Sequence, residues 1–284
     1  MNIGSIATAM ITPFREDGSI HFEMVSDVVE HLIANGTDSI VVCGTTGESP
    51  TLSHDEKVAL IRFVVKTVHN RVTVIAGTGS NNTQASIDLT NKAEAAGADG
   101  IMLVAPYYNK PSQRGMYEHF AAIAQSTTLP IMLYNIPGRS IVNIQPQTVL
   151  QLSKIPNIRI VKEASGNLDQ MTEILAGAPD GFTVYSGDDG LTLPLLSIGG
   201  AGVDMQKMVK AFKEGRHEEA ASIHQALLPL IRALFATPNP STVKYALTKL
   251  GIGSEYVRSP ITLLTDEEKS AFDDVWQEYE KKQI

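Results

Sequence analysis

Residues 158–165 read IRIVKEAS, a β-branched apolar run that ends in charged and small residues. Such a run predicts a strand buried in a sheet, with Lys162 at its carboxyl end. Lysine is rarely placed inside a protein without a partner or a function. Residues 131–139 read IMLYNIPGR and likewise change from apolar to polar and turn-forming residues. We therefore expect two strands to present polar side chains at one edge of a sheet.

Apolar runs of this kind recur along the chain. They cover residues 6–10, 39–43, 72–76, 100–104, 131–134, 158–162 and 182–185. Their starts lie roughly 25 to 35 residues apart with helical patterns between them, which is the βα rhythm of a parallel sheet. Several runs are apolar throughout, so both faces of the sheet must be covered, as in an α/β protein of the (β/α)8 TIM barrel type. A doubly wound open sheet is the alternative, but no early Gly-x-Gly-x-x-Gly turn supports it.

The rhythm breaks where an eighth strand should begin. Residues 199–203 read GGAGV, yet residues 204–213 already have the pattern of an amphipathic helix. A barrel of seven strands would have two open edges or an altered tilt and shear. We therefore expect the eighth strand to be missing after Val203, within an absent segment of about ten residues.

Helical patterns dominate the rest of the chain, at residues 218–235, 241–250 and 266–282. The expected organisation is a barrel with the catalytic site at residues 1–215 and a C-terminal helical extension at residues 216–284. Within the barrel, Ser53 precedes Glu56 at capping-box spacing, which predicts the start of a helix.

The composition is that of a soluble globular protein: 284 residues, 43% apolar and 19% charged. No apolar run is long enough to span a membrane, and the N-terminus lacks the pattern of a signal peptide, so a cytoplasmic location is expected. The single cysteine, Cys43, excludes an internal disulfide. A net charge of −8 and a pI near 5.4 argue against nucleic acid as a partner and leave a small-molecule substrate.

Lys162 could act as a nucleophile toward a carbonyl group. Burial disfavours the ammonium form, and the free amine could then attack a ketone and leave a Schiff base. The same sequence would also suit a lysine that reaches solvent from the strand end or pairs with Glu163. Neighbouring residues must decide between these two interpretations.

Polar residues that follow neighbouring strands could complete such a site. The Tyr134 phenol could move protons to and from a carbinolamine, and the planar guanidinium of Arg139 suits a substrate carboxylate. Residues 44–51 read GTTGESPT, where backbone N–H groups and hydroxyls could hold an anion and Thr45 could pass on a proton. A buried tyrosine ring, a surface arginine and a plain turn are the structural alternatives.

Metal chemistry has little support in the sequence. Asp188 and Asp189 follow the seventh predicted strand, but the seven histidines show no ligand spacing. We therefore expect no metal and no cofactor. The adjacent Tyr107 and Tyr108, on a proline-flanked loop, are typical of an interface.

Three motifs together point to a known family. Residues 44–48 (GTTGE), 134–139 (YNIPGR) and 162–166 (KEASG) resemble the signatures of the 4-hydroxy-tetrahydrodipicolinate synthase (dihydrodipicolinate synthase) family, and the resemblance covers nearly the whole chain. That family belongs to the pyruvate-dependent class I aldolases, with N-acetylneuraminate lyase and 2-keto-3-deoxygluconate aldolase. The Thr45-Thr46 pair and Arg139 favour the synthase, and a sister aldolase acting on a sugar acid is the alternative.

The resemblance implies a lyase of lysine and diaminopimelate biosynthesis. Lys162 would form the Schiff base with pyruvate, Thr46 and its neighbouring amides would hold the pyruvate carboxylate, and the Gly187 backbone would line the site. Arg139 would bind the carboxylate of L-aspartate 4-semialdehyde. The enamine would attack this aldehyde, and cyclisation would give 4-hydroxy-tetrahydrodipicolinate.

The resemblance also implies an assembly. Tyr134, Thr45 and Tyr108 would form a proton relay, with Tyr108 contributed across a dimer interface. Members of the family are commonly dimers of dimers, so a homotetramer is expected.

Two departures from the family qualify these expectations. Lysine-inhibited members have a histidine and a glutamate in an effector cleft where this chain has Lys57 and Ala85, although other cleft positions match. The vestigial cleft would comprise Ser49, His54, Lys57, Asn81 and Tyr107. Because a cation at Lys57 repels the ammonium groups of lysine, weak or absent feedback is expected. The missing eighth strand is the second departure, and it leaves a catalytically impaired barrel kept as a binding or scaffold protein as a further alternative.

Overall fold

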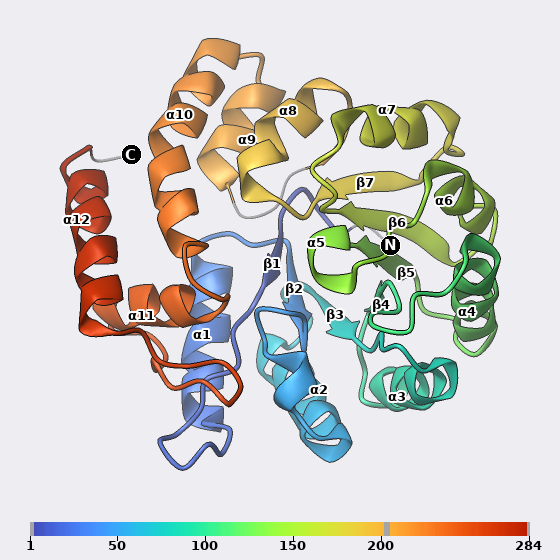
Figure 1. The fold of residues 1–284 in the computed structure, drawn as a ribbon, viewed down its shortest axis with the longest axis horizontal. Helices are drawn as coiled ribbons and strands as arrows, with labels where there is room; N and C mark the ends of the chain where they lie inside the picture. The colour runs from blue at the N-terminus through green and yellow to red at the C-terminus, as the bar shows by residue number, and fades with distance from the viewer. Residues whose placement is uncertain (1–2, 202–204, 283–284) are drawn as a thin grey trace.

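The computed structural model describes residues 3–201 and 205–282. Seven parallel strands form one curled sheet in sequence order, with helices around its outer face (Figure 1). The strands are β1 (Ala7–Ala9), β2 (Ser39–Val42), β3 (Thr73–Gly77), β4 (Gly100–Val104), β5 (Ile131–Asn135), β6 (Ile158–Glu163) and β7 (Thr183–Ser186). All seven predicted strands are confirmed, with small differences at their ends.

Helices follow the strands as the βα rhythm predicts. They are α1 (Phe22–Ala34), α2 (His54–Val68), α3 (Thr83–Ala95), α4 (Gln113–Gln125), α5 (Pro137–Ser140), α6 (Pro146–Leu152), α7 (Leu168–Gly177), α8 (Thr192–Ser197), α9 (Gln206–Lys213), α10 (His217–Leu234), α11 (Ser241–Lys249) and α12 (Asp266–Lys282), with short 3-10 turns at Ser49–Thr51 and Asp189–Leu191. The predicted capping box begins α2: Ser53 N donates to Glu56 Oε2 at 2.8 Å, and Glu56 N donates to Ser53 Oγ at 3.2 Å. Both bonds satisfy N–H groups that the first helical turn leaves free.

The two faces of the sheet carry different side chains because residues alternate along a strand. Outward-facing residues such as Ile40, Ile101 and Leu103 pack against the helices in one large apolar core. Inward-facing residues, including Met102 and Met132, fill the inside of the curl. Tyr134, Tyr185 and Lys162 face inward together, because Lys162 pairs in register with Tyr134 on β5 and with Tyr185 on β7.

The outer edge of β7 lies where the eighth strand of a barrel would pair. There, Ala201 forms a single parallel bridge with Tyr185, and its N–H donates to Val184 O at 2.8 Å. The predicted missing segment follows Val203, which lies outside the described residues, and α9 then begins at Gln206, close to the predicted helix start. The Tyr185 hydroxyl donates to the carbonyl of Gly4 ahead of β1. In the parts of the chain that are described, the fold is therefore a seven-stranded curled sheet of TIM-barrel order rather than a closed eight-stranded barrel.

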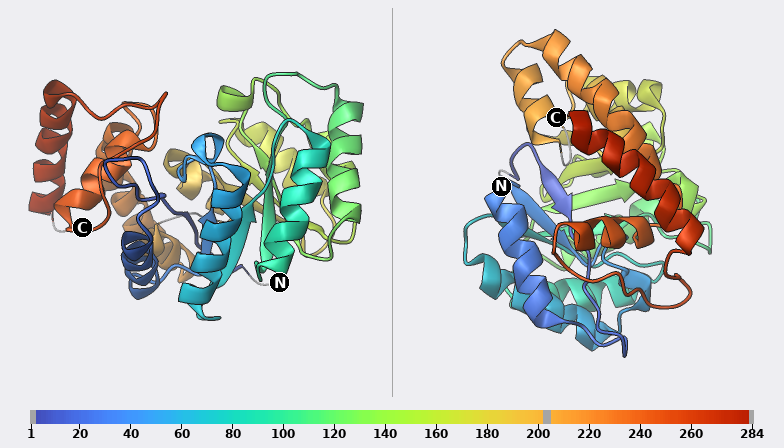
Figure 2. Two further views of the ribbon diagram at one scale, coloured as in Figure 1. Left: turned by 90° about the horizontal axis from the view of Figure 1, so that it is seen from below. Right: turned by 90° about the vertical axis from the view of Figure 1, so that its left-hand side faces the viewer.

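The last three helices, α10–α12, lie on the side of the molecule away from α3 and α4 (Figure 2). Val243 and Leu247 of α11 pack against the large core. The predicted boundary between residues 215 and 216 stays a prediction. Among the described residues, no helix combines the length and apolarity that crossing a membrane requires.

Candidate active site

Lys162 lies at the carboxyl end of β6, inside the curl of the sheet. The residue is 9% exposed, and its Nζ lies 4.8 Å from the centre of the Tyr134 ring. A Cβ at Gly187 would come within 3.1 Å of both Cγ and Cε of Lys162. Glycine at this position therefore leaves the space in which the lysine side chain extends, so Gly187 contributes through its lack of a side chain.

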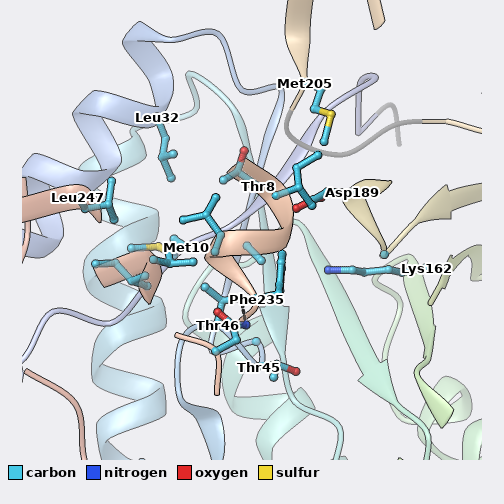
Figure 3. Close-up of a pocket in the computed structure, with 18 of the residues that line it drawn as sticks. Thr8, Met10, Leu32, Thr45, Thr46, Lys162, Asp189, Met205, Phe235 and Leu247 are labelled. Atoms are coloured by element: carbon cyan, nitrogen blue, oxygen red, sulfur yellow. Dashed lines mark hydrogen bonds between the residues drawn. The ribbon is translucent and has the colours of Figure 1, made fainter. Parts of the chain in front are cut away.

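The lysine opens into a cavity of about 380 Å³. Predicted site residues from three separate segments of the chain contribute to its polar lining, namely Thr45, Thr46, Tyr134, Arg139 and Lys162. In Figure 3, the Lys162 side chain extends from its strand toward Thr45, Thr46 and Phe235. Apolar residues of α10 and α11, including Leu230 and Leu247, line the other side. The structure thus brings the predicted site residues of β2, β5 and β6 to one cavity at the carboxyl edge of the sheet.

The loop after β2 is held in a tight, non-repetitive conformation. Glu48 has a φ of 54°, Glu48 N donates to Thr45 O at 3.0 Å, and the Thr12 hydroxyl donates to Gly47 O at 2.7 Å. The backbone N–H groups of Thr45 and Thr46 donate to no acceptor within residues 3–201 and 205–282. Unpaired N–H donors beside a lysine favour an anionic ligand.

A buried ion pair that the sequence did not reveal supports this loop. Lys244 Nζ donates to Glu48 Oε1 at 2.5 Å and to Tyr256 O at 2.6 Å, and both charged side chains are almost completely buried. Arg258 N donates to Glu48 Oε2 at 2.9 Å. Burial is the main cause that lowers the pKa of Lys244 to about 8, while the Glu48 carboxylate opposes this shift. The C-terminal helices are thereby tied directly to the loop that carries Thr45 and Thr46.

A second buried network lies behind Lys162, on the outer face of β6. The Glu163 carboxylate, which is fully buried, accepts hydrogen bonds from Asn135 Nδ2 at 3.1 Å, Gln170 Nε2 at 2.9 Å and Ser165 N at 2.8 Å. Because Glu163 faces away from Lys162 along the strand, this network excludes the predicted alternative of a Lys162–Glu163 pair. It fixes instead the ends of β5 and β6, from which Tyr134 and Lys162 project.

Tyr108 and Arg139 border a second cavity of about 380 Å³ that also contacts Thr45 and Tyr134. Tyr108 is 85% exposed and has a φ of 72°, so its ring projects from the surface of the single chain. Arg139 is exposed on the short helix α5, which the sequence did not predict. Neither residue packs inside the chain, which suits contacts made with a substrate or a second subunit.

The predicted effector residues do not all line the same cavity. Ser49, Lys57 and Tyr107 line the second cavity, whereas His54 lies beside a separate shallow depression with Asp88. Asn81 lines neither cavity, and its carbonyl accepts from Asn109 Nδ2 at 2.9 Å. The cleft therefore stays a prediction for this chain.

Of the two candidate aspartates, Asp189 lines the cavity that contains Lys162. The described residues hold no cluster of three or more His, Cys, Asp or Glu side chains with metal-binding geometry, and Asp188 instead caps the 3-10 turn through Gly190 N at 3.0 Å. Burial raises the pKa of the Cys43 thiol to about 12, so the reactive thiolate is scarce at neutral pH.

The Glu56–Arg258 pair should make stability depend on acid pH. Hydrogen bonds from Arg258, at 2.5 and 2.9 Å, are the main cause that lowers the Glu56 pKa to about 2. Because the folded-state pKa lies below the ordinary value of 4.5, this pair stabilises the fold above pH 4.5, and the contribution is lost as the pH falls toward 2. Glu56→Gln should lower the free energy of unfolding by about 1 kcal/mol at pH 7, since the pair is partly exposed. Urea unfolding across this range should show the difference from wild type shrinking; a constant difference would contradict the assignment.

Comparisons with known proteins agree with the predicted family. The model of the dihydrodipicolinate synthetase family matches residues 2–279. A 4-hydroxy-tetrahydrodipicolinate synthase of Bacillus velezensis is 54% identical over 98% of this chain and 100% of its own length. The crystal structure of a dihydrodipicolinate synthase from Bacillus anthracis superposes with a TM-score of 0.96 at 53% identity, covering 98% of each chain. A structure from Cyanidioschyzon merolae described as having lysine bound has a TM-score of 0.95 at 41% identity, covering 98% of each chain.

One alignment has more positions than this chain has residues. The synthase of Oceanobacillus iheyensis is 50% identical, and its alignment runs over 294 positions while covering the whole of both chains. That is ten positions more than the 284 residues of this chain. Family match, sequence identity and fold lead to one conclusion: the chain belongs to the dihydrodipicolinate synthetase family.

Proposed function

We propose that this chain is a 4-hydroxy-tetrahydrodipicolinate synthase, a lyase that condenses pyruvate with L-aspartate 4-semialdehyde. One observation carries the proposal: the Lys162 amine lies beside the Tyr134 ring in the cavity that Thr45 and Thr46 also line. A buried amine, a phenol and unpaired N–H donors together suit a 2-oxo acid, whose ketone and carboxylate need different partners. Relatives more than half identical over nearly their whole length carry this name.

The chemistry then proceeds at Lys162. The neutral amine attacks C2 of pyruvate, and loss of water leaves a protonated Schiff base that acts as an electron sink. Removal of a proton from C3 gives an enamine, whose C3 forms the new carbon–carbon bond with the aldehyde carbon. The amino group of the second substrate finally attacks C2, closes the ring and releases Lys162.

Each step moves a proton, and we infer that the hydroxyls of Tyr134 and Thr45 carry them. Tyr134 lies on the strand next to Lys162, and Thr45 lines both cavities. Tyr108 would complete the relay from a second subunit, which its 85% exposure in the single chain supports. We infer a homotetramer built from two such dimers, in the cytoplasm.

Arg139 supports the choice of aldehyde. Arg139 lines both cavities, and its guanidinium could take the carboxylate of L-aspartate 4-semialdehyde in a bidentate arrangement. A sister aldolase would need groups that recognise the hydroxyls of a sugar acid at this place. Coupled assays that compare L-aspartate 4-semialdehyde with sugar-derived aldehydes, each with pyruvate, test the assignment. Faster turnover of a sugar-derived aldehyde would contradict it.

Lysine should inhibit this enzyme weakly or not at all. Lys57 lines the second cavity, where desolvation by burial lowers its pKa and Cys43 opposes the shift; Ala85 is exposed and uncharged. Neither side chain attracts the ammonium groups of lysine. A titration of turnover with lysine measures the effect, and Lys57→His combined with Ala85→Glu should increase it. Strong inhibition of the unaltered enzyme at physiological lysine concentrations would refute this expectation.

A further inference from the structure

Asn239, in the turn between α10 and α11, reaches the candidate active site from the C-terminal helices. It is 8% exposed, it lines the cavity that contains Lys162, and its Nδ2 lies 3.0 Å from Thr46 Oγ1. The dashed line at Thr46 in Figure 3 marks this hydrogen bond. We propose that Asn239 is a positioning residue that sets the direction of the Thr46 hydroxyl toward the substrate carboxylate, an inference that rests on the proposed function.

Thr46 Oγ1 is the acceptor in its hydrogen bond with Asn239. An amide nitrogen only donates, so Thr46 Oγ1 accepts from Asn239 and keeps its own proton. That proton has no acceptor within the described residues. It is therefore available to a carboxylate, beside the unpaired N–H groups of Thr45 and Thr46. The opposite orientation of the amide would use up the proton and turn the hydroxyl away from an anion.

The other end of the Asn239 amide supports a functional role. Its Oδ1 is buried and has no hydrogen-bond partner in the described structure. A buried unsatisfied acceptor costs stability, so a side chain selected only for packing would not be expected here. Retaining the amide makes sense if its N–H group is required at Thr46.

The surrounding structure holds both partners of this contact in place. Five residues beyond Asn239, Lys244 forms its buried ion pair with Glu48, which lies two residues beyond Thr46. Lys244 N also donates to Pro240 O at 2.9 Å. The turn of Asn239 and the loop of Thr46 are thus joined at two neighbouring points, so the hydroxyl is oriented before substrate binds.

The test compares Asn239→Asp and Asn239→Ala with Ser241→Ala. Asn239→Asp makes the side chain an acceptor and should raise the KM for pyruvate by about tenfold or more. Its kcat at saturating pyruvate should fall by less than about threefold, and the KM for L-aspartate 4-semialdehyde should change by less than about twofold. Asn239→Ala only removes the donor, so it should raise the pyruvate KM less than Asn239→Asp does.

Because a protonated carboxyl can again donate, the KM of Asn239→Asp should fall toward that of wild type as the pH is lowered. The KM of Asn239→Ala should lack this recovery.

Ser241→Ala is the matched control. Ser241 is the first residue of α11, two positions after Asn239; it is 4% exposed and donates to Thr262 O at 2.8 Å rather than to the substrate loop. It should lower the melting temperature and leave the pyruvate KM within about twofold of wild type. If the Asn239 variants leave this KM as unchanged as Ser241→Ala does, the inference is wrong. Should Asn239→Asp not fold, Asn239→Ala decides by the same criterion. Absence of a reducible pyruvate adduct in the wild-type enzyme would instead overturn the proposed function.

Discussion

Replacing Lys162 with alanine is expected to reduce turnover by at least about 10³-fold, because the covalent route through a Schiff base is then closed. Lys162→Arg is the sharper variant. It keeps a positive charge in the cavity, but a guanidinium stays protonated and forms no Schiff base with a ketone. Both variants should therefore be inactive in the coupled assay with pyruvate and L-aspartate 4-semialdehyde.

Stability measurements separate lost chemistry from lost folding. Lys162 has a ring contact with Tyr134 and is not part of the buried network at Glu163. Lys162→Arg should consequently melt within a few degrees of wild type, as expected for a change of about 1 kcal/mol or less in a protein of this size. Turnover above about 10% of the wild-type value would show that the amine is dispensable for catalysis.

Replacing Lys244 with alanine is expected to destabilise the fold strongly. The pair with Glu48 is 0% and 1% exposed, so its loss leaves a carboxylate without its cation in a dry environment. Breaking such a buried pair costs about 3–5 kcal/mol in the free energy of unfolding, which urea unfolding measures directly. The loop with Thr45 and Thr46 would lose its anchor, so pyruvate binding should weaken as well.

Two further variants test whether the lost stability comes from breaking the buried ion pair. Lys244→Met combined with Glu48→Gln removes both charges and should recover a large part of the lost stability. Arg114→Ala breaks an ion pair with Glu118 whose side chains are 87% and 67% exposed, and it should cost less than about 0.5 kcal/mol. If Lys244→Ala cost no more than Arg114→Ala, the buried ion pair would not support the loop.

The sequence was sufficient to predict the strands and the core of the site because both depend on local patterns. Apolar runs with regular spacing predicted β1–β7, and parallel pairing placed the ends of neighbouring strands together, so Tyr134 and Lys162 had to meet. The role of the loop after β2 came from the resemblance of GTTGE to the family motif, since its composition alone also suits a plain turn. These predictions required no knowledge of distant contacts.

Other features depend on contacts between residues far apart in the chain. Asn239 and Lys244 meet Thr46 and Glu48 from nearly 200 positions away, as the separations of 193 and 196 show. The sequence around Lys244 does not distinguish it from a lysine that faces solvent. Glu163 has its carboxylate bound by Asn135 and Gln170, a set that no spacing rule connects.

The most direct test of the account is borohydride reduction of the wild-type protein in the presence of pyruvate, followed by intact-mass measurement and peptide mapping. A Schiff base reduced in place becomes a stable secondary amine, so the account predicts one pyruvate-derived group per chain, on Lys162, and none in Lys162→Arg. An unmodified wild-type chain, or an adduct on a different lysine, would contradict the central claim that Lys162 is the nucleophile.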